Sequence, residues 1–345
     1  GEDTRESAYF MSANRNKRSI ALDINKPEGQ DIVRALAAQS DILLENYKVG
    51  GLARYGLGYD DLKAHNPGLV YCSITGFGQD GPRRNEPGYD FVIQAMSGFM
   101  ALTGEPQGQP MKMGISISDL TCGLYSVIGI QAALAMRART GRGQHVDMAL
   151  LDCSVGLLAS QAMHFLTTGE NPPRMGNEHA QVSAYGVFPV ADGKVVLAPA
   201  NDGLFRRLLT LLGRNDLLTD ERFATNGSRV QHREALVPTL ALALAAQPTD
   251  TWLAACEAVG VPCGPINTLD RVFDDPHVKA RGLKQTLPHA LAGEVNLVAN
   301  PIRINGQSLS AQSAPPTLGE HTDSVLDAIG ITDEQRLVLR QAGII

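Results

Sequence analysis

The chain has 345 residues, of which 43% are hydrophobic and 19% are charged, and its formal net charge at pH 7 is −6. This length suits one large or two ordinary domains with a sizeable core. No basic stripe is visible, so we expect no nucleic-acid partner. The five cysteines lack CxxC or zinc-type spacing and the eight histidines form no HExxH pair. We therefore expect no disulfides, no metal site and a reducing, cytoplasmic compartment.

The first half of the chain alternates predicted helices and strands. Pro27 opens a helical pattern, because proline is favoured at the first helical position. The apolar segments 41–47 and 69–78 predict strands, and a long helix is predicted over 118–139. Strands separated by helices of this length indicate an α/β fold with a parallel sheet.

The longest uncharged apolar stretch runs over 120–136, close to the lower length limit of a membrane span. Thr121, Gln131 and several small residues favour a buried, closely packed helix instead. We therefore expect no membrane partner.

Residues 141–155, GRGQHVDMALLDCSV, place Asp152 where a predicted strand meets a predicted helix. The apolar residues of 146–150 alternate as in a strand, whereas those from Val155 to Met163 recur at helical spacing. One interpretation makes the aspartate an N-cap, which stabilises a helix by about 1 kcal/mol. The other makes it a nucleophile or base whose ionised form the helix N-terminus favours. The stretch alone leaves both open.

The second half of the chain has a different composition and a different pattern of apolar residues. A polar linker with proline and glycine precedes an Asp-Gly turn between two apolar runs, which predicts a β-hairpin over 185–200. Thr332 and Gln335 match a capping box near the C-terminus. Helices are predicted over 204–212, 230–246 and 250–259.

We predict four parts from these patterns and from the resemblance described next. They are a large domain over 1–170, a linker over 171–184, a small α+β domain over 185–290, and a C-terminal segment over 291–345 that returns to the large domain.

Seven stretches, in this order, resemble the class III CoA-transferases, the CaiB/BaiF or formyl-CoA transferase family. The first three are closest to its succinyl-CoA:glutarate branch. The resemblance implies a Rossmann-like large domain, a smaller α+β domain, an interlocked homodimer, and a further β-α-β segment of the CoA site before Gly1. The stretches are YFMSANRNKRSIALDINKPEG, LLENYKVGGLARYGLGYDDL, YCSITGFGQDGP, GYDFVIQAMSG, TGRGQHVDMALLDCSV, GVPCGPINTLDRVFDDP and LGEHTDSVL.

The resemblance also implies that Asp152 is a covalent nucleophile. It would attack the donor acyl-CoA to give a mixed anhydride and CoA thiolate, and the thiolate would then form an aspartyl-CoA thioester. The acceptor acid would repeat the steps in reverse. Backbone N–H groups near Cys153 are expected to stabilise the oxyanions. The expected substrate-binding residues are Tyr9, Tyr89 and Asp90, although each also suits a structural role: a core tyrosine or a helix cap.

CoA enters this scheme as a substrate, and no permanently bound cofactor is expected. Two departures from the formyl-CoA transferase branch are that Asn25 and Pro87 replace lysines, and that no glycine-rich loop is present near 174–190. The first departure weakens the assignment of those two positions to CoA binding, and the second argues against formyl-CoA and oxalate as substrates. The positions that match the family's CoA contacts are Leu22, Asp23, Ile24, Asn25, Asn46, Tyr47, Lys48 and Arg54.

The sequence thus predicts a CoA-transferase that moves CoA from an acyl-CoA, with succinyl-CoA as a candidate donor, to a small dicarboxylic acid. Arg54, Arg83 and Arg84 are candidates to recognise the remote carboxylate. Two alternatives stay open: an α-methylacyl-CoA racemase, whose members carry histidine at the position of Tyr89, and an inert CoA-binding homologue. The sequence names neither the acids nor the pathway.

Overall fold

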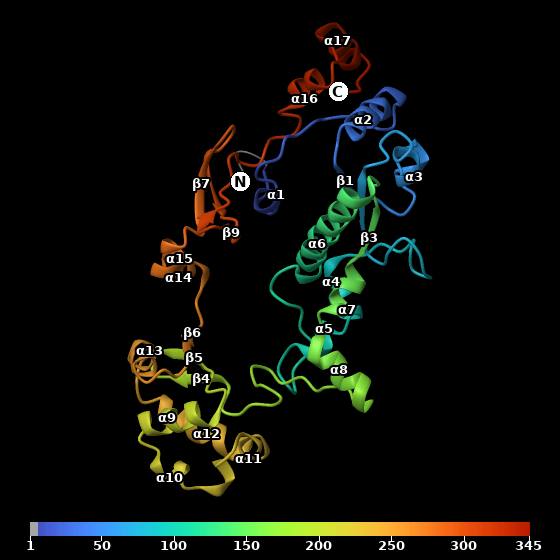
Figure 1. The fold of residues 1–345 in the computed structure, drawn as a ribbon. Helices are drawn as coiled ribbons and strands as arrows, with labels where there is room; N and C mark the ends of the chain where they lie inside the picture. Colours follow the sequence, from blue (N-terminus) through green and yellow to red (C-terminus); the bar gives the residue numbers. More distant parts are fainter. Residues whose placement is uncertain (1–5) are drawn as a thin grey trace. The chain divides into compact units, whose positions relative to one another are not determined.

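The computed structural model describes residues 6–345, which divide into two compact units (Figure 1). Unit 1 comprises residues 6–97, 114–159 and 271–345, and unit 2 comprises 98–113 and 160–270. The first five residues of the predicted large domain lie outside the described residues. The domain boundaries proposed from the sequence stay predictions.

A three-stranded parallel sheet forms the centre of unit 1. Its strands are β1 (Ile42–Glu45), β2 (Val70–Thr75) and β3 (His145–Ala149), in that spatial order. Helix α2 (Pro27–Ala38) precedes β1, and α6 (Ile117–Thr140) lies in the connection from β2 to β3; both helices were predicted. The α/β class and the parallel sheet are therefore confirmed.

The central strand β2 is buried on both faces, which explains its nearly continuous apolar sequence. On one face Tyr71 packs with Leu62 of α3 (Tyr59–Leu62) and with Ala37 of α2. On the other face Cys72 packs with Ile130 of α6. Helices on both faces thus fix the plane of the sheet.

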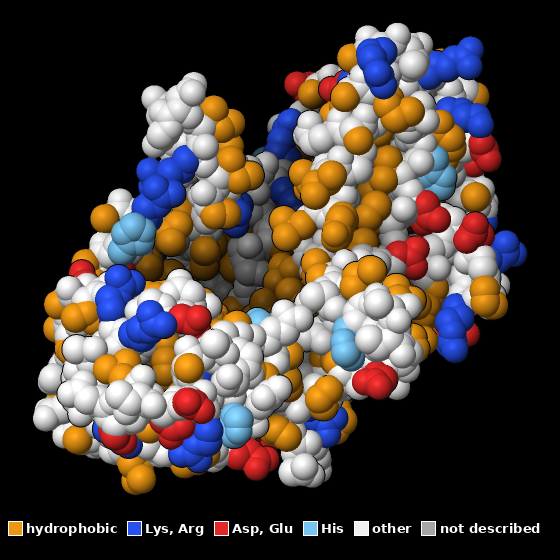
Figure 2. All heavy atoms as spheres, turned by 60° about the horizontal axis from the view of Figure 1, so that its bottom comes forward, with side chains coloured by type: hydrophobic (Ala, Val, Ile, Leu, Met, Phe, Trp, Pro, Cys, Tyr) orange, Lys and Arg blue, Asp and Glu red, His pale blue; other side chains and the backbone are white. Residues whose placement is uncertain are grey.

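Helix α6 is only partly buried within its own chain, so the prediction of a fully packed helix is wrong. Its buried residues include small ones such as Ser118 and Ser126, whereas Leu124 and Ile128 are exposed. The physical reason is that large apolar residues occupy the face that this chain leaves uncovered. Figure 2 shows apolar side chains gathered in exposed patches.

Among residues 6–345, α6 is also the one helix long and apolar enough to cross a membrane. That criterion uses length and composition alone, and core helices of soluble proteins satisfy it too.

The strand–helix junction at Asp152 differs from the prediction in two ways. Strand β3 ends at Ala149, and α7 (Leu150–Gly156) begins at once, with Ala149 as its N-cap. The helical pattern is then broken before α8 (Ala159–Thr168), whose first residue has a φ of +46°. The spacing of apolar residues persists across the break, which is why it is invisible in the sequence.

Unit 2 contains an antiparallel sheet of β4 (Gly186–Val190), β5 (Gly193–Leu197) and β6 (Cys263–Pro265). The predicted hairpin is therefore confirmed. The helix predicted over 230–246 is two helices, because the chain leaves helical geometry at His232. The helices of this unit are α5 (Phe99–Leu102), α9 (Asp202–Leu211), α10 (Asn215–Leu218), α11 (Asn226–Gln231), α12 (Arg233–Leu244) and α13 (Thr249–Ala258).

The C-terminal segment pairs with the N-terminal one inside unit 1. The Asp23 amide donates to the Ile344 carbonyl at 2.8 Å, and the His321 amide donates to the Ser19 carbonyl at 2.8 Å. The capping box of Thr332 and Gln335 is confirmed. The remaining elements are α1 (Ala8–Ala13), η1 (Ala53–Tyr55), α4 (Asp90–Met96), α14 (Leu269–Asp274), α15 (Pro276–Ala280), β7 (Lys284–His289), β8 (Gly293–Val298), β9 (Arg303–Ile304), β10 (Gln307–Ser308), α16 (Thr322–Ala328), α17 (Asp333–Gln341) and, in unit 2, η2 (Glu221–Phe223).

A fully buried arginine organises the polar side of the unit 2 core. Arg229 donates to the carbonyls of Ser183 and Phe223 and pairs with Asp202 at 2.7 Å, and its guanidinium lies 4.2 Å from the Phe205 ring centroid. These partners come from three segments: Ser183 precedes β4, Asp202 and Phe205 lie in α9, and Phe223 ends η2. Its removal would leave these buried acceptors without a donor.

We predict that Arg229→Met lowers the free energy of unfolding by about 3–5 kcal/mol, because the buried Ser183 and Phe223 carbonyls lose their donor at about 1–3 kcal/mol each. Arg222→Met is the matched control. Arg222 pairs with Asp220 on the surface, so its loss should cost about 1 kcal/mol or less. Thermal and urea unfolding of both variants measure the difference; equal losses would contradict the structural role of Arg229.

Candidate active site

The predicted site residues of unit 1 follow the ends of its parallel strands. Residues 46–48 follow β1, Gly76 follows β2, and Asp152 lies in the first turn after β3. Because the carboxyl ends of parallel strands lie at one edge of a sheet, these segments share that edge. Ligands of open α/β sheets bind at this edge.

Two glycines bring a third segment to the same edge. A Cβ on Gly88 would lie 2.3 Å from the Cα of Gly76, so the two backbones are in direct contact. The Leu151 amide also donates to the Gly76 carbonyl at 3.1 Å. Gly76 therefore touches both the turn that precedes Tyr89 and the turn that carries Asp152.

Asp152 is exposed at the third position of α7. The N-cap interpretation is wrong, since Ala149 occupies the cap. The neighbouring thiol does not compete as a nucleophile, because burial raises the pKa of Cys153 and raises that of Cys122 in the same apolar cluster to about 12. The Asp152 carboxylate is the exposed ionisable group of this turn.

Tyr89 and Asp90 stand at the start of α4 with different surroundings. Tyr89 is the N-cap residue and is 71% exposed. Both carboxylate oxygens of Asp90 accept hydrogen bonds, from the Ser118 amide at 2.9 Å and from the Gln94 side chain at 2.7 Å. Asp90 is the first residue of α4 after the N-cap Tyr89, so the helix-cap interpretation is wrong; its carboxylate instead accepts from an amide in the first turn of α6.

Tyr9 of α1 meets a residue that the sequence analysis did not select. Its hydroxyl donates to Asp119 of α6 at 3.4 Å, and its ring is 71% exposed. Burial raises the pKa of the Asp119 carboxyl, the charge of Asp90 adds to the rise, and the Tyr9 hydrogen bond opposes it. An acidic residue in the first turn of a helix is so common that its position gave no functional signal.

The predicted CoA residues fall into two groups. Asp23 accepts hydrogen bonds from the main-chain and side-chain nitrogens of Asn25, which lower the pKa of Asp23. Tyr55 donates to Asn25 at 2.7 Å and accepts from Arg54. The structure therefore brings the 22–25 segment and Arg54 together.

The second group is the turn after β1. Tyr47 donates its amide to the Glu45 carboxylate at 2.7 Å, and its ring is half exposed. Lys48 lines a pocket of about 280 Å³ together with the glycines at 50 and 51. Glu45 and two further carboxylates also line this pocket, so Lys48 supplies its one positive charge.

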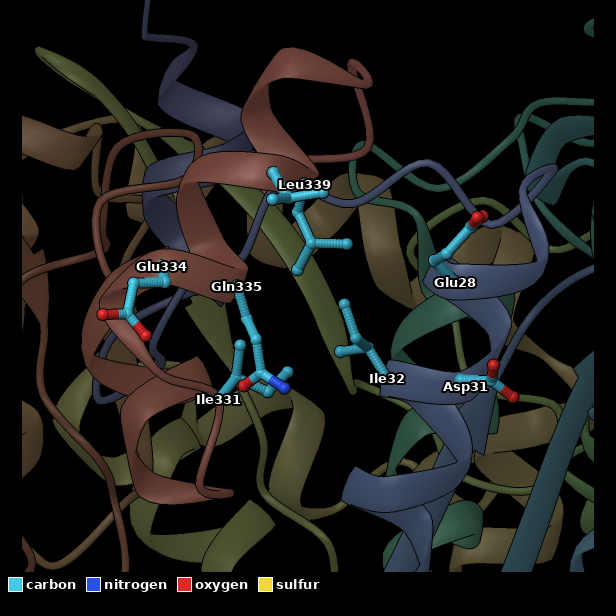
Figure 3. Close-up of a pocket in the computed structure, with 8 residues that line it drawn as sticks. Glu28, Asp31, Ile32, Ile331, Glu334, Gln335 and Leu339 are labelled. Atoms are coloured by element: carbon cyan, nitrogen blue, oxygen red, sulfur yellow. The ribbon is translucent and has the colours of Figure 1, made fainter.

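A larger pocket, of about 410 Å³, contains none of the predicted site residues (Figure 3). It lies between α2 and α17, with Ile32 and Leu339 facing each other and with Glu28, Asp31 and Glu334 around it. Three carboxylates and no Lys or Arg in this lining make it unsuitable for an anionic ligand. Within the described part of the chain, no group of three or more His, Cys, Asp or Glu residues is placed to hold a metal ion.

The residues beneath the site were missed from the sequence. Ser118 and Ser154 are buried and hydrogen-bonded to each other at 3.0 Å, although they are far apart in the chain. Gln94 is buried below Asp90. A polar residue on the buried face of a helix was the available signal, but only tertiary structure identifies its partner.

Comparison with known proteins gives consistent matches. The model of CoA-transferase family III matches residues 1–322. A succinate–glutarate CoA-transferase of Agrobacterium fabrum is 47% identical over 320 residues, which cover 93% of this chain and 80% of that protein. A succinyl-CoA:glutarate CoA-transferase of Mus musculus is 38% identical over 343 residues, which cover 97% and 79%.

Among solved structures, a CaiB/BaiF family protein from Brucella suis is 49% identical with a TM-score of 0.84, covering 94% of this chain and 84% of that one. The chain therefore belongs to CoA-transferase family III. It is an acyl-CoA:carboxylate CoA-transferase, and the family and activity predicted from the sequence are confirmed.

We predict that Gly88→Ala lowers kcat/KM about 10- to 100-fold, because its methyl group would displace the start of α4 from Gly76. Gly227→Ala is the control, since its added Cβ meets nothing within 4 Å. Steady-state assays of CoA transfer on both variants test this. A Gly88→Ala enzyme as active as the control would show that the glycine contact does not position the site.

Proposed function

We propose that the chain transfers CoA from succinyl-CoA to a small dicarboxylic acid such as glutarate, with Asp152 as the covalent nucleophile. The observation that carries this proposal is the exposed Asp152 carboxylate at the carboxyl edge of the parallel sheet, beside the turn of Tyr89. A carboxylate is ionised at pH 7 and becomes an effective nucleophile when it is positioned and partly stripped of water.

The reaction begins when an Asp152 oxygen attacks the thioester carbonyl of the donor. The C–S bond breaks, which leaves a mixed anhydride and CoA thiolate. The thiolate attacks the aspartyl carbonyl, releases the donor acid and forms an aspartyl-CoA thioester. The acceptor carboxylate attacks this thioester to form a second anhydride, and CoA thiolate then attacks the acceptor's acyl carbonyl and regenerates Asp152. Four acyl exchanges, arranged as two symmetric halves, replace one difficult transfer.

The polar groups at the sheet edge have separate roles in this proposal. Tyr89 has an exposed ring and a hydroxyl that can donate to a thioester or acyl oxygen, whereas the Tyr9 hydroxyl can do so only by leaving Asp119, to which it donates at 3.4 Å. The Leu151 amide is engaged by Gly76, so oxyanion stabilisation falls to other amides of the turn. Asp90 contributes by fixing the start of α6 as well as by any contact with substrate.

CoA is a polyanion, whereas the chain has a net charge of −6, so binding must use local donors. Arg54, Lys48 and the amides of the turn after β1 lie at the edge where the phosphates would bind. The pairing of Asn25 with Tyr55 connects the 22–25 segment to Arg54.

The acceptor assignment rests on two kinds of support. Relatives at 47% and 38% identity are named as transferases that use succinate or succinyl-CoA and glutarate. In addition, Arg83 and Arg84 lie on the loop 77–87, whose two ends meet at the Gly76–Gly88 contact. Arg83 pairs with Glu86 at 2.8 Å, which leaves Arg84 as the better candidate to bind the remote carboxylate.

A racemase is disfavoured because position 89 is a tyrosine. The histidine of the racemases accepts and donates a proton, whereas a tyrosine hydroxyl at this position serves as a hydrogen-bond donor. An inert homologue is disfavoured by the exposed carboxylate of Asp152 at the edge where substrates bind.

We also propose a Rossmann-like large domain and an interlocked homodimer. The parallel sheet with helical connections supports the first. The exposed apolar face of α6, with Leu120, Leu124, Val127 and Ile128, supports an interface with a second copy. A cytoplasmic location is part of the proposal, supported by five free cysteines.

We predict that Asp152→Asn and Asp152→Ala abolish CoA transfer without unfolding the protein. Hydroxylamine added during turnover should convert Asp152 of the unmodified enzyme to a hydroxamate that peptide mass spectrometry detects. Asp147 is an internal control, because it lies in β3 and accepts a hydrogen bond from the Gln79 amide. Turnover by a verified Asp152→Ala preparation at the unmodified rate would overturn the mechanism.

We predict that glutarate is a better acceptor than butyrate, because only the diacid has a remote carboxylate that a cationic side chain can bind. Arg84→Met should reduce kcat/KM for glutarate by at least tenfold and leave butyrate within about twofold, since a hydrogen bond to a charged group contributes about 1.5–3 kcal/mol. Arg139→Met, on the last turn of α6, is the control. Equal kcat/KM for the two acids in the unmodified enzyme would reject the diacid assignment.

A further inference from the structure

A buried pair of hydroxyl groups joins α6 to α7 just beyond the nucleophile. Ser154 Oγ donates to Ser118 Oγ at 3.0 Å, and both side chains are completely buried. Cys122 and Cys153, on the same two helices, belong to an apolar cluster. A hydroxyl loses its hydration in such surroundings, and one internal hydrogen bond little more than offsets that loss. The pair therefore adds little to the free energy of unfolding and acts mainly by fixing the orientation of α7 relative to α6.

Asp152 lies between two anchors. On its N-terminal side the Leu151 amide is bonded to the Gly76 carbonyl at 3.1 Å. On its C-terminal side Ser154 is bonded to Ser118. Helix α7 is short, and its N-cap residue makes no side-chain capping bond. These two bonds therefore restrain the turn on both sides of the carboxylate.

Ser118, the other member of the pair, is also fixed by a hydrogen bond. The Ser118 amide donates to Asp90 Oδ1 at 2.9 Å, and Asp90 Oδ2 accepts from Gln94 at 2.7 Å. Asp90 directly follows Tyr89 in the chain. The Tyr89 segment is thus connected to the Asp152 turn through two successive hydrogen bonds.

We propose that Ser118 and Ser154 are positioning residues that set the Asp152 carboxylate relative to Tyr89. This inference rests on the proposed function, in which Asp152 reacts. The aspartyl carbonyl is formed and attacked repeatedly within one turnover, so a misplaced turn would slow every covalent step. Substrate binding would be affected much less, because neither serine is exposed to the ligand.

The test compares Ser118→Ala, Ser154→Ala and the double variant in the full chain. We expect each single variant to lose at least tenfold in kcat with KM within threefold of the unmodified value. The double variant should be no slower than the slower single variant, because both changes break the same hydrogen bond. Hydroxylamine trapping at Asp152 should fall in parallel with kcat.

Ser126→Ala is the matched control. Ser126 is a buried serine of the same helix, but its hydroxyl donates to the Cys122 carbonyl within α6 at 2.7 Å, so kcat should stay within twofold. A folded Ser154→Ala enzyme with unmodified kcat would overturn the inference. Should the alanine variants fail to fold, Ser154→Cys decides: it keeps the shape with a slightly larger side chain and weakens the hydrogen bond, so an unmodified kcat overturns the inference and a reduced kcat in a folded enzyme supports it.

Asp152→Asn separates this inference from the proposed function. An inactive Asp152→Asn enzyme with fully active serine variants would reject the positioning role alone. An active Asp152→Asn enzyme would reject the nucleophile, and the positioning role with it.

Discussion

The site depends on the contact between two glycine backbones, Gly76 after β2 and Gly88 before α4. Neither position has room for a side chain, and the carbonyl of Gly76 also holds the Leu151 amide. One residue of main chain therefore fixes both the turn before Tyr89 and the turn of Asp152. The side chains to which we assign the reaction are exposed, so the backbone beneath them must provide their rigidity.

Two aspartates near this contact, Asp90 and Asp152, differ in their surroundings and in the roles that we assign to them. Asp90 has both oxygens engaged by groups of the protein, whereas the Asp152 carboxylate is exposed. The same residue type at two helix starts therefore has two different environments. The buried hydrogen bonds in which Asp90 participates order the segments that carry the exposed groups, which is how a small number of buried polar atoms can specify a unique arrangement.

Several elements of the fold were predictable from the sequence, and the physical reason differs from one element to the next. The helix at Pro27 and the hairpin around the Asp-Gly turn rest on local backbone preferences, which the sequence states directly. The break between α7 and α8 was not predictable, because the apolar spacing continues through it. The pairing of Ser118 with Ser154 was hidden as well, since hydrogen bonds between residues distant in the chain leave no local pattern.

The pairing of the two ends of unit 1 has a consequence for the order in which the chain folds during synthesis. The segment near Asp23 is bonded to Ile344, and Ser19 is bonded to His321, whereas all of unit 2 lies between these segments. On the ribosome, which delivers the chain from its N-terminus, unit 2 can complete its core before the last strands and helices of unit 1 emerge. The three strands of the parallel sheet are complete at Ala149, whereas the segment around Ser19 and Asp23 stays unpaired until the C-terminal residues are made, so the hydrogen bonds between the two ends of unit 1 are among the last of its contacts to form.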